Sequence, residues 1–280
     1  MQPTLSCSDY TFPLLSHDHA LDLVAMLGFT AVDIGLFEDR SHLWPSRVFL
    51  DLEQNAHALR RKLCNRGLKL ADLFLQTALE FVSAAPNHPD AAVRSRSREL
   101  FVQACEFTAQ CGGGHITALP GALFGSEPAA SSLARCVEEL SWRVRQAREF
   151  GLVFSVEAHL GSIAPTPGDA LALVRAVEGL TLTLDYTHFI KQGYTDANVE
   201  PLIAHASHFH ARGAAPGQLQ TAVKDSTIDY RRVVRCMREK GYTGCICIEY
   251  TWSEWEDCNR TDNLSETVLL RDEIAGCLIT

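Results

Sequence analysis

Short apolar runs alternate along the chain with longer stretches in which apolar residues recur every three or four positions. The short runs are typical of buried strands, and the longer stretches are typical of amphipathic helices. Their regular alternation predicts βα units around a parallel sheet. The eight predicted strands are 4–6, 31–37, 70–76, 115–119, 153–159, 180–185, 206–210 and 245–249. The seven predicted helices between them are 18–27, 50–65, 91–111, 131–150, 167–177, 199–205 and 230–240.

Glycines mark the ends of most of these predicted helices. A left-handed residue is favoured at such positions, before the chain turns into the next strand. The six glycines are Gly28, Gly67, Gly112, Gly151, Gly179 and Gly241. Eight strands alternating with helices in about 250 residues is the size and order of a (β/α)8 TIM barrel, an α/β fold. An open doubly wound sheet is the alternative, but residues 7–13 after the first strand contain no phosphate-binding glycine.

The chain contains no Pro-rich or Ser-rich linker and no low-complexity tract. We therefore interpret residues 1–280 as a single domain. Residues 251–280, which follow the eighth strand, begin with a segment rich in Trp and acidic residues. We expect this tail to form a C-terminal loop and a closing helix over residues 264–278.

Composition and charge narrow the class of protein. With 46% hydrophobic and 21% charged residues the chain can bury a substantial core, which excludes a disordered segment. The chain has 25 Lys and Arg against 34 Asp and Glu, a formal net charge of −9. This balance disfavours nucleic acid and anionic membranes as partners. Small molecules and metal cations are the expected partners.

The cysteines and the N-terminus predict a cytoplasmic location. Ten cysteines are scattered through predicted helices and strands, and no C-x-x-C pair occurs. Scattered cysteines of this kind usually act as small buried apolar residues, and their thiols stay reduced in the cytoplasm. The N-terminus lacks a basic segment followed by an apolar one, and no run of 18 apolar residues follows.

The candidate chemistry lies at the ends of the last four predicted strands. In a barrel of this kind the reacting groups come from the C-terminal ends of strands. Glu157, Asp185, His210 and Glu249 lie at or near the ends of strands five to eight. Each acid taken alone could be an ordinary strand-end residue paired with a helix, but four such residues on consecutive strands favour a metal site. An oxygen-dominated set suits Mn²⁺, Mg²⁺ or Co²⁺ and tolerates Zn²⁺.

Three further polar residues follow the proposed ligands. His159 and His188 lie two or three residues beyond an acid, where each could bind a substrate hydroxyl or be a satisfied structural histidine. Arg212 could hold a substrate oxygen or neutralise Asp185. His208 shares the strand face of His210 but lies farther from the strand end, so His210 is the better ligand.

These motifs resemble those of the xylose isomerase-like TIM-barrel superfamily, and most closely its sugar phosphate isomerase/epimerase family. The motifs are Val-Glu157-Ala-His159, Leu-Asp185-Tyr-Thr-His188, Phe-His210-Ala-Arg212 and Ile-Glu249-Tyr. The resemblance implies that Glu157, Asp185, His210 and Glu249 bind one divalent metal ion. It also implies that Glu157 and Glu249 pass the substrate proton and that His188 contacts a substrate oxygen. Arg212 departs from the pattern, because related epimerases place their arginine several residues beyond the metal histidine.

The resemblance and the chemistry of the site together predict a metal-dependent sugar isomerase or epimerase of carbohydrate metabolism. The substrate would be a ketose or keto-sugar derivative, and proton abstraction next to its carbonyl would proceed through a metal-stabilised enediolate. A homo-oligomer is also compatible with such a family.

Three alternatives stay open. A dehydratase or lyase acting on an inosose or keto-glycoside would use the same metal site, with His159 or His188 as the acid. An endonuclease would need extra ligands on strands two to four, which end in Phe37, Gln76 and Pro120. A non-catalytic sugar-binding barrel is the third alternative.

Overall fold

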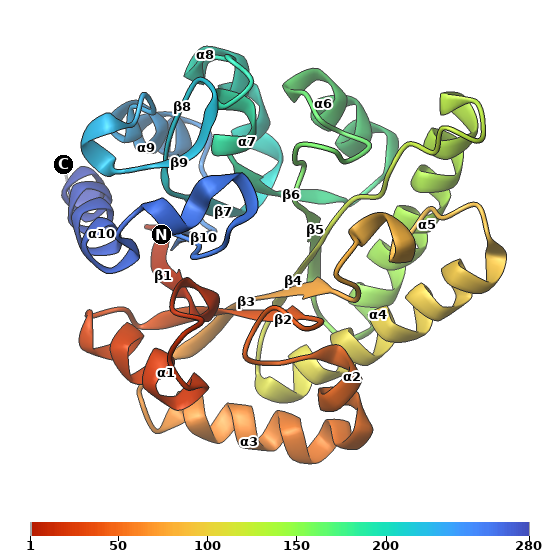
Figure 1. Ribbon diagram of the computed structural model, residues 1–280, viewed down its shortest axis with the longest axis horizontal. Helices are drawn as coiled ribbons and strands as arrows, with labels where there is room; N and C mark the ends of the chain where they lie inside the picture. Colours follow the sequence, from red (N-terminus) through yellow and green to blue (C-terminus); the bar gives the residue numbers. More distant parts are fainter. Residues whose placement is uncertain (1, 280) are drawn as a thin grey trace.

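The computed structural model describes residues 2–279 and shows a closed barrel of eight parallel strands surrounded by helices (Figure 1). The predicted (β/α)8 TIM barrel is therefore confirmed. The order around the barrel is β1-β10-β7-β6-β5-β4-β3-β2. These strands are β1 (Thr4–Ser8), β2 (Ala31–Phe37), β3 (Lys69–Gln76), β4 (His115–Ala118), β5 (Val153–Val156), β6 (Thr181–Asp185), β7 (Ala206–Ala211) and β10 (Cys245–Ile248).

Long helices form the outer layer (Figure 1). They are α1 (His17–Met26), α3 (Leu52–Cys64), α4 (Ala91–Cys111), α5 (Ala129–Glu149), α6 (Pro167–Ala176), α9 (Tyr230–Glu239) and α10 (Asn263–Ile279). Side chains of Ser16, Asp51, Asp90, Thr166 and Asp229 cap five of their N-termini. All six glycines predicted at helix ends have φ between +66° and +86°, a region that favours glycine.

Shorter helical segments lie in the connections. The short α-helices are α2 (Pro45–Val48), α7 (Thr187–Ile190) and α8 (Asp196–Val199). The 3-10 helices are η1 (Asp9–Thr11), η2 (Phe49–Asp51), η3 (Phe81–Ala84), η4 (Glu200–His205), η5 (Val223–Asp225) and η6 (Trp255–Arg260). Within residues 2–279, every helix is too short or too polar to cross a bilayer.

Two of the differences from the sequence prediction lie on either side of β7. The stretch 199–205 is not a long crossover helix, because η4 replaces it and carries Pro201 in its first turn. After β7 the chain forms an unpredicted antiparallel hairpin of β8 (Gly213–Ala215) and β9 (Gln218–Thr221). The turn of this hairpin contains Gly217 at φ +83°, which a residue without a side chain adopts readily. The strands of this hairpin, Gly-Ala-Ala and Gln-Leu-Gln-Thr, are too short to show the apolar periodicity on which the prediction depended.

The barrel register places the C-terminal ends of β6, β7 and β10 at one level. Asp185, at the end of β6, pairs with His210 in β7, and His210 pairs with Cys247 in β10. All of these pairings are parallel, so the side chains that follow these positions project at the same end of the barrel. Strand register, rather than sequence proximity, therefore brings the distant polar residues together.

The outer layer contains a buried ion cluster where α4 packs against α5. Arg143 and Glu139 on α5 are 2% and 1% exposed, and their Nη1 and Oε2 atoms lie 2.9 Å apart. Arg98 of α4 donates two hydrogen bonds, of 3.0 and 2.9 Å, to the same carboxylate. A buried guanidinium that loses its partner keeps its desolvation penalty, so this cluster depends on Glu139.

We predict that Glu139→Ala lowers the free energy of unfolding by about 3–5 kcal/mol, because it leaves Arg143 buried without its carboxylate. Urea denaturation followed by circular dichroism measures this change. Glu138→Ala is the matched control, since the Glu138 side chain is 75% exposed and lies 4.0 Å from Arg98. The control should cost less than about 1 kcal/mol. Equal unfolding midpoints for the two variants would contradict the assignment.

Candidate active site

The four predicted ligands all lie at the C-terminal end of the barrel. Asp185 ends β6, His210 lies opposite it in β7, and Glu157 and Glu249 directly follow β5 and β10. None of these residues is more than 6% exposed. The structure thus gathers three carboxylates and an imidazole from four consecutive strands of the barrel wall.

His210 lies between two of the carboxylates. Its Nδ1 atom is 2.7 Å from Oε1 of Glu157 and 3.3 Å from Oε1 of Glu249. The Tyr10 hydroxyl donates a 2.8 Å hydrogen bond to the same Glu249 oxygen. Among the described residues, Oε2 of Glu249 has no hydrogen-bond partner although it is buried. Glu157, His210 and Glu249 therefore form a compact donor group, with ligand atoms within 4.8 Å of one another.

Asp185 is held differently, because it is paired with Arg212. Nη2 of Arg212 donates a 2.8 Å hydrogen bond to Oδ2 of Asp185. The backbone amide and hydroxyl of Thr187 donate to Oδ1, at 2.8 and 2.7 Å. Burial alone would raise the pKa of Asp185, but Arg212 and His188 lower it to about 2. The structure thus pairs Arg212 with Asp185, the contact expected if Arg212 neutralises that carboxylate.

The two glutamates have opposite shifts in pKa. Burial raises the pKa of Glu249 to about 7, although His210 and Arg212 act against this shift. For Glu157 burial acts in the same direction, but the hydrogen bond from His210 prevails and the pKa is lowered. Burial would lower the pKa of His210, yet Glu249 and its other neighbours raise it well above the ordinary value. Two carboxyl groups with separated pKa values can act as a base and an acid.

His159 and His188 form a wall beside Glu157. Their ring centroids are 5.7 Å apart, and His159 also packs edge-on against Phe81 at 5.1 Å. Trp255 lies 6.1 Å from His188 and is 52% exposed. Within residues 2–279, Nε2 of His159 and Nδ1 of His188 are buried without a hydrogen-bond partner. Both nitrogens are therefore free to bond a hydroxyl of a ligand.

Aromatic rings cover the other side of His210. Tyr10, Phe37 and Phe74 form a small buried cluster, in which Phe37 contacts both other rings at about 5 Å between centroids. The Phe74 ring lies 5.9 Å from the imidazole of His210. This cluster keeps water from one face of the polar group and gives the site an apolar wall.

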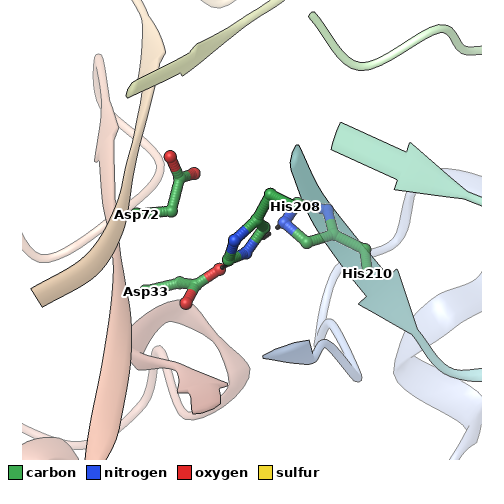
Figure 2. Close-up of side chains that lie close together, drawn as sticks. All are labelled: Asp33, Asp72, His208 and His210. Carbon is green, nitrogen blue, oxygen red and sulfur yellow. Dashed lines mark hydrogen bonds and ion pairs between the residues drawn. The ribbon is translucent and has the colours of Figure 1, made fainter. Parts of the chain in front are cut away.

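A second polar group lies within the barrel beneath His210 (Figure 2). His208 and His210 extend from β7 toward Asp33 on β2 and Asp72 on β3 (Figure 2). Nε2 of His208 is 2.5 Å from Oδ2 of Asp33, and Nε2 of His210 is 3.7 Å from the same oxygen. Burial would raise the pKa of Asp33, but the two histidines lower it. His115 is similarly paired with Asp72 at 2.6 Å.

Sequence reasoning missed three of these residues. Tyr10 follows β1 in a segment without a strand pattern, so nothing local indicated that it reaches Glu249. Asp33 and Asp72 lie inside strands rather than at the strand ends, where the predicted ligands lie. A charged residue within an apolar strand of a barrel was an available signal, because an unpaired buried carboxylate is rare.

The residues at the barrel mouth fit a divalent cation. Carboxylate and imidazole donors without thiolate suit a hard or intermediate metal ion. The unpartnered Oε2 of buried Glu249 supports this fit within the described residues. A metal-bound imidazole must be neutral, so binding would release the proton that the carboxylates favour on His210. The buried cluster can thus hold a metal ion.

A family profile described as "Xylose isomerase-like TIM barrel" matches residues 21–273. No curated protein sequence matches the chain. This profile covers most of the barrel, including all four predicted ligands.

Several solved structures share the fold. D-Psicose 3-epimerase with D-tagatose, from Clostridium cellulolyticum H10, has a TM-score of 0.78 at 14% identity and covers 99% of both chains. The probable 3-DHS dehydratase AsbF of Bacillus anthracis has a TM-score of 0.69 at 13% identity, over 96% of this chain and 98% of that one. A xylose isomerase-like TIM barrel protein from Mycobacterium smegmatis, in complex with magnesium, has a TM-score of 0.74 at 16% identity, over 99% and 97%. At such identities these similarities establish the fold.

We predict that the buried His188 makes stability depend on pH. Burial lowers the pKa of His188 from 6.5 to about 4. Between these values the unfolded chain binds a proton that the folded protein does not, so the free energy of unfolding falls as the pH falls. The slope from this residue is about 1.4 kcal/mol per pH unit.

Urea denaturation of metal-free protein at pH 7 and pH 5 measures this effect. His188→Gln should lose less stability than the wild type on acidification, because glutamine does not titrate in this range. Identical losses in the two proteins would show that the imidazole of His188 is not held neutral by the fold.

Proposed function

The chain belongs to the xylose isomerase-like TIM barrel family, and from this premise we propose that it is a divalent-metal-dependent isomerase or epimerase. The proposed substrate is a ketose or keto-sugar derivative. The observation that carries the proposal is the approach of two carboxylates, Glu157 and Glu249, to the same Nδ1 atom of His210. Two proton-transfer groups close to one ligand atom suit a reaction that removes and returns a proton.

Glu157, Asp185, His210 and Glu249 are the proposed ligands of one divalent ion, with Mn²⁺, Mg²⁺ and Co²⁺ as the candidates. When bound, such an ion would supply Lewis-acid polarisation of the substrate carbonyl. The compact donor group of Glu157, His210 and Glu249 and the oxygen-rich chemistry of the set support this assignment.

The proposed reaction is a proton transfer between the substrate and two carboxyl groups. Glu157, as the carboxylate, accepts the proton from the carbon next to the carbonyl, and the electron pair of that C–H bond forms an enediolate. Glu249, as the acid, returns a proton to the opposite face of the same carbon or to the neighbouring carbon. The first outcome is an epimerisation and the second an isomerisation. Tyr10 orients Glu249 through its 2.8 Å hydrogen bond.

The wall beside Glu157 is proposed to bind the substrate's hydroxyl groups. His159 and His188 each present a ring nitrogen without a hydrogen-bond partner in the described chain. Arg212, the third proposed substrate-binding residue, approaches the site from β7 but is engaged by Asp185. The aromatic rings of Phe81 and Trp255 border the same wall, and such rings pack well against the apolar face of a sugar.

A dehydratase is the second candidate. His188 lies with Glu157 and Asp185 in one group of ligand-type atoms within 4.8 Å, so its neutral imidazole could hydrogen-bond a leaving hydroxyl beside the base. Glu249, as the acid, would protonate that hydroxyl after the same C–H bond has broken. The fold shared with a probable 3-DHS dehydratase is consistent with this candidate.

We predict that Glu157→Gln and Glu249→Gln each slow proton exchange at the substrate carbon by about 10²–10⁴-fold, because each removes one proton-transfer group. NMR in D₂O with Mn²⁺-loaded protein and a panel of ketoses, inososes and keto-glycosides measures this exchange. The same spectra distinguish an epimer, an aldose and an eliminated enone, and the enone would identify the dehydratase.

Glu254→Gln is the matched control, since Glu254 lies in the segment that follows Glu249 but is exposed to solvent. This control should exchange as fast as the wild type. Full exchange in both glutamate variants would overturn the proposed roles. Sugar binding by the wild type without any exchange across the panel would instead favour a non-catalytic barrel.

A further inference from the structure

We infer that Arg212 is an internal cation that competes with the divalent metal ion for Asp185 and so weakens metal binding at this site. The inference rests on the proposed metal site but makes a separate claim about its affinity. Without a metal ion, Asp185 would pair with Arg212. A metal ion would then first bind Glu157, His210 and Glu249, and would have to displace Arg212 to bind Asp185.

Arg212 lies directly after β7, and its position relative to His210 directs its side chain into the barrel mouth. Arg212 follows His210 by two residues, and side chains two apart along an extended segment lie on the same side. The side chain is 3% exposed, so the guanidinium is enclosed by the site rather than by solvent.

The guanidinium lies between two of the proposed metal ligands. Its Nη2 atom is 2.8 Å from Oδ2 of Asp185 and 3.7 Å from Oε2 of Glu249. Its other nitrogens donate to the hydroxyls of Thr187 and Thr251, each at 3.2 Å. The group is therefore fixed from several directions and keeps its positive charge beside both carboxylates.

Asp185 has no oxygen left without a partner. Thr187 occupies Oδ1 with two hydrogen bonds, and Arg212 occupies Oδ2 with a charge-assisted one. A metal ion that recruits Asp185 must break such a bond, whereas Oε2 of Glu249 is free of hydrogen bonds within residues 2–279. Among the groups of ligand-type atoms within 4.8 Å, Asp185 occurs with Glu157 and His188 and not with His210 and Glu249.

The charges act in the same direction as the geometry. Three carboxylates attract a divalent ion, and Arg212 offsets one of their negative charges at short range. Electrostatic interactions between buried groups are weakly screened, so this offset affects metal binding strongly. Arg212 would also stabilise the metal-free protein, because three buried carboxylates without a cation would repel one another.

The test is calorimetric titration of metal-free protein with Mn²⁺. Arg212→Gln should bind Mn²⁺ at least about tenfold more tightly than the wild type, because it removes a nearby positive charge and frees Asp185. Arg212→Lys retains the charge and should resemble the wild type more than it resembles Arg212→Gln. Adding Asp185→Asn to Arg212→Gln should abolish the gain, which assigns the gain to Asp185 as a ligand.

If Arg212→Gln does not fold without metal, its urea midpoint at increasing Mn²⁺ concentration yields the same comparison, because the stabilisation by a bound ligand rises with the logarithm of its concentration divided by its Kd. Equal Mn²⁺ affinities in the wild type and Arg212→Gln would overturn the inference and leave the metal site intact. Absence of Mn²⁺ binding in every protein would overturn both the inference and the metal dependence. Proton exchange in D₂O, measured with and without Mn²⁺, reports separately on the proposed reaction.

Discussion

The repulsion among three buried carboxylates is the constraint on which the barrel mouth depends. Glu157, Asp185 and Glu249 are brought together by strands that must close into a barrel, and each is almost entirely removed from water. Carboxylates placed so closely remain ionised only where positive charge or hydrogen-bond donors face them. Arg212 faces Asp185, and His210 faces the two glutamates, so each carboxylate has a cationic or donor group beside it.

The same principle extends below the mouth into the barrel interior. Layers of apolar side chains commonly fill this space. Here carboxylate–histidine pairs cross it instead, because Asp33 is hydrogen-bonded to His208 and Asp72 to His115. Each charge is paired, which offsets the desolvation that burial imposes. Asp33 also approaches His210 from the side opposite the glutamates, so it restricts the orientation of that imidazole. The site is therefore supported by a polar interior rather than by a hydrophobic plug.

The fold and the catalytic strands were predictable because their signals are local. Apolar periodicity located eight strands, and residues directly after them located Glu157 and Glu249. Tyr10 was not predictable, because its hydrogen bond to Glu249 joins residues 239 positions apart. The hairpin of β8 and β9 was also missed, since strands of three and four residues around a Pro-Gly turn have no extended hydrophobic pattern. Such features depend on neighbours that only closure of the barrel supplies.

By itself the sequence determined the order of strands and helices, the glycines at which the helices end, and the identity of the acids at the strand ends. These properties follow from backbone preferences and from the burial of apolar faces, which act over a few residues. Only the tertiary structure decided which charge faces which. Arg212 could have held a ligand or Asp185, and the parallel register of β6 and β7 brings its guanidinium to Asp185. Which charged groups pair depends on the distances between them in the folded protein, and the order of residues along the chain does not give those distances.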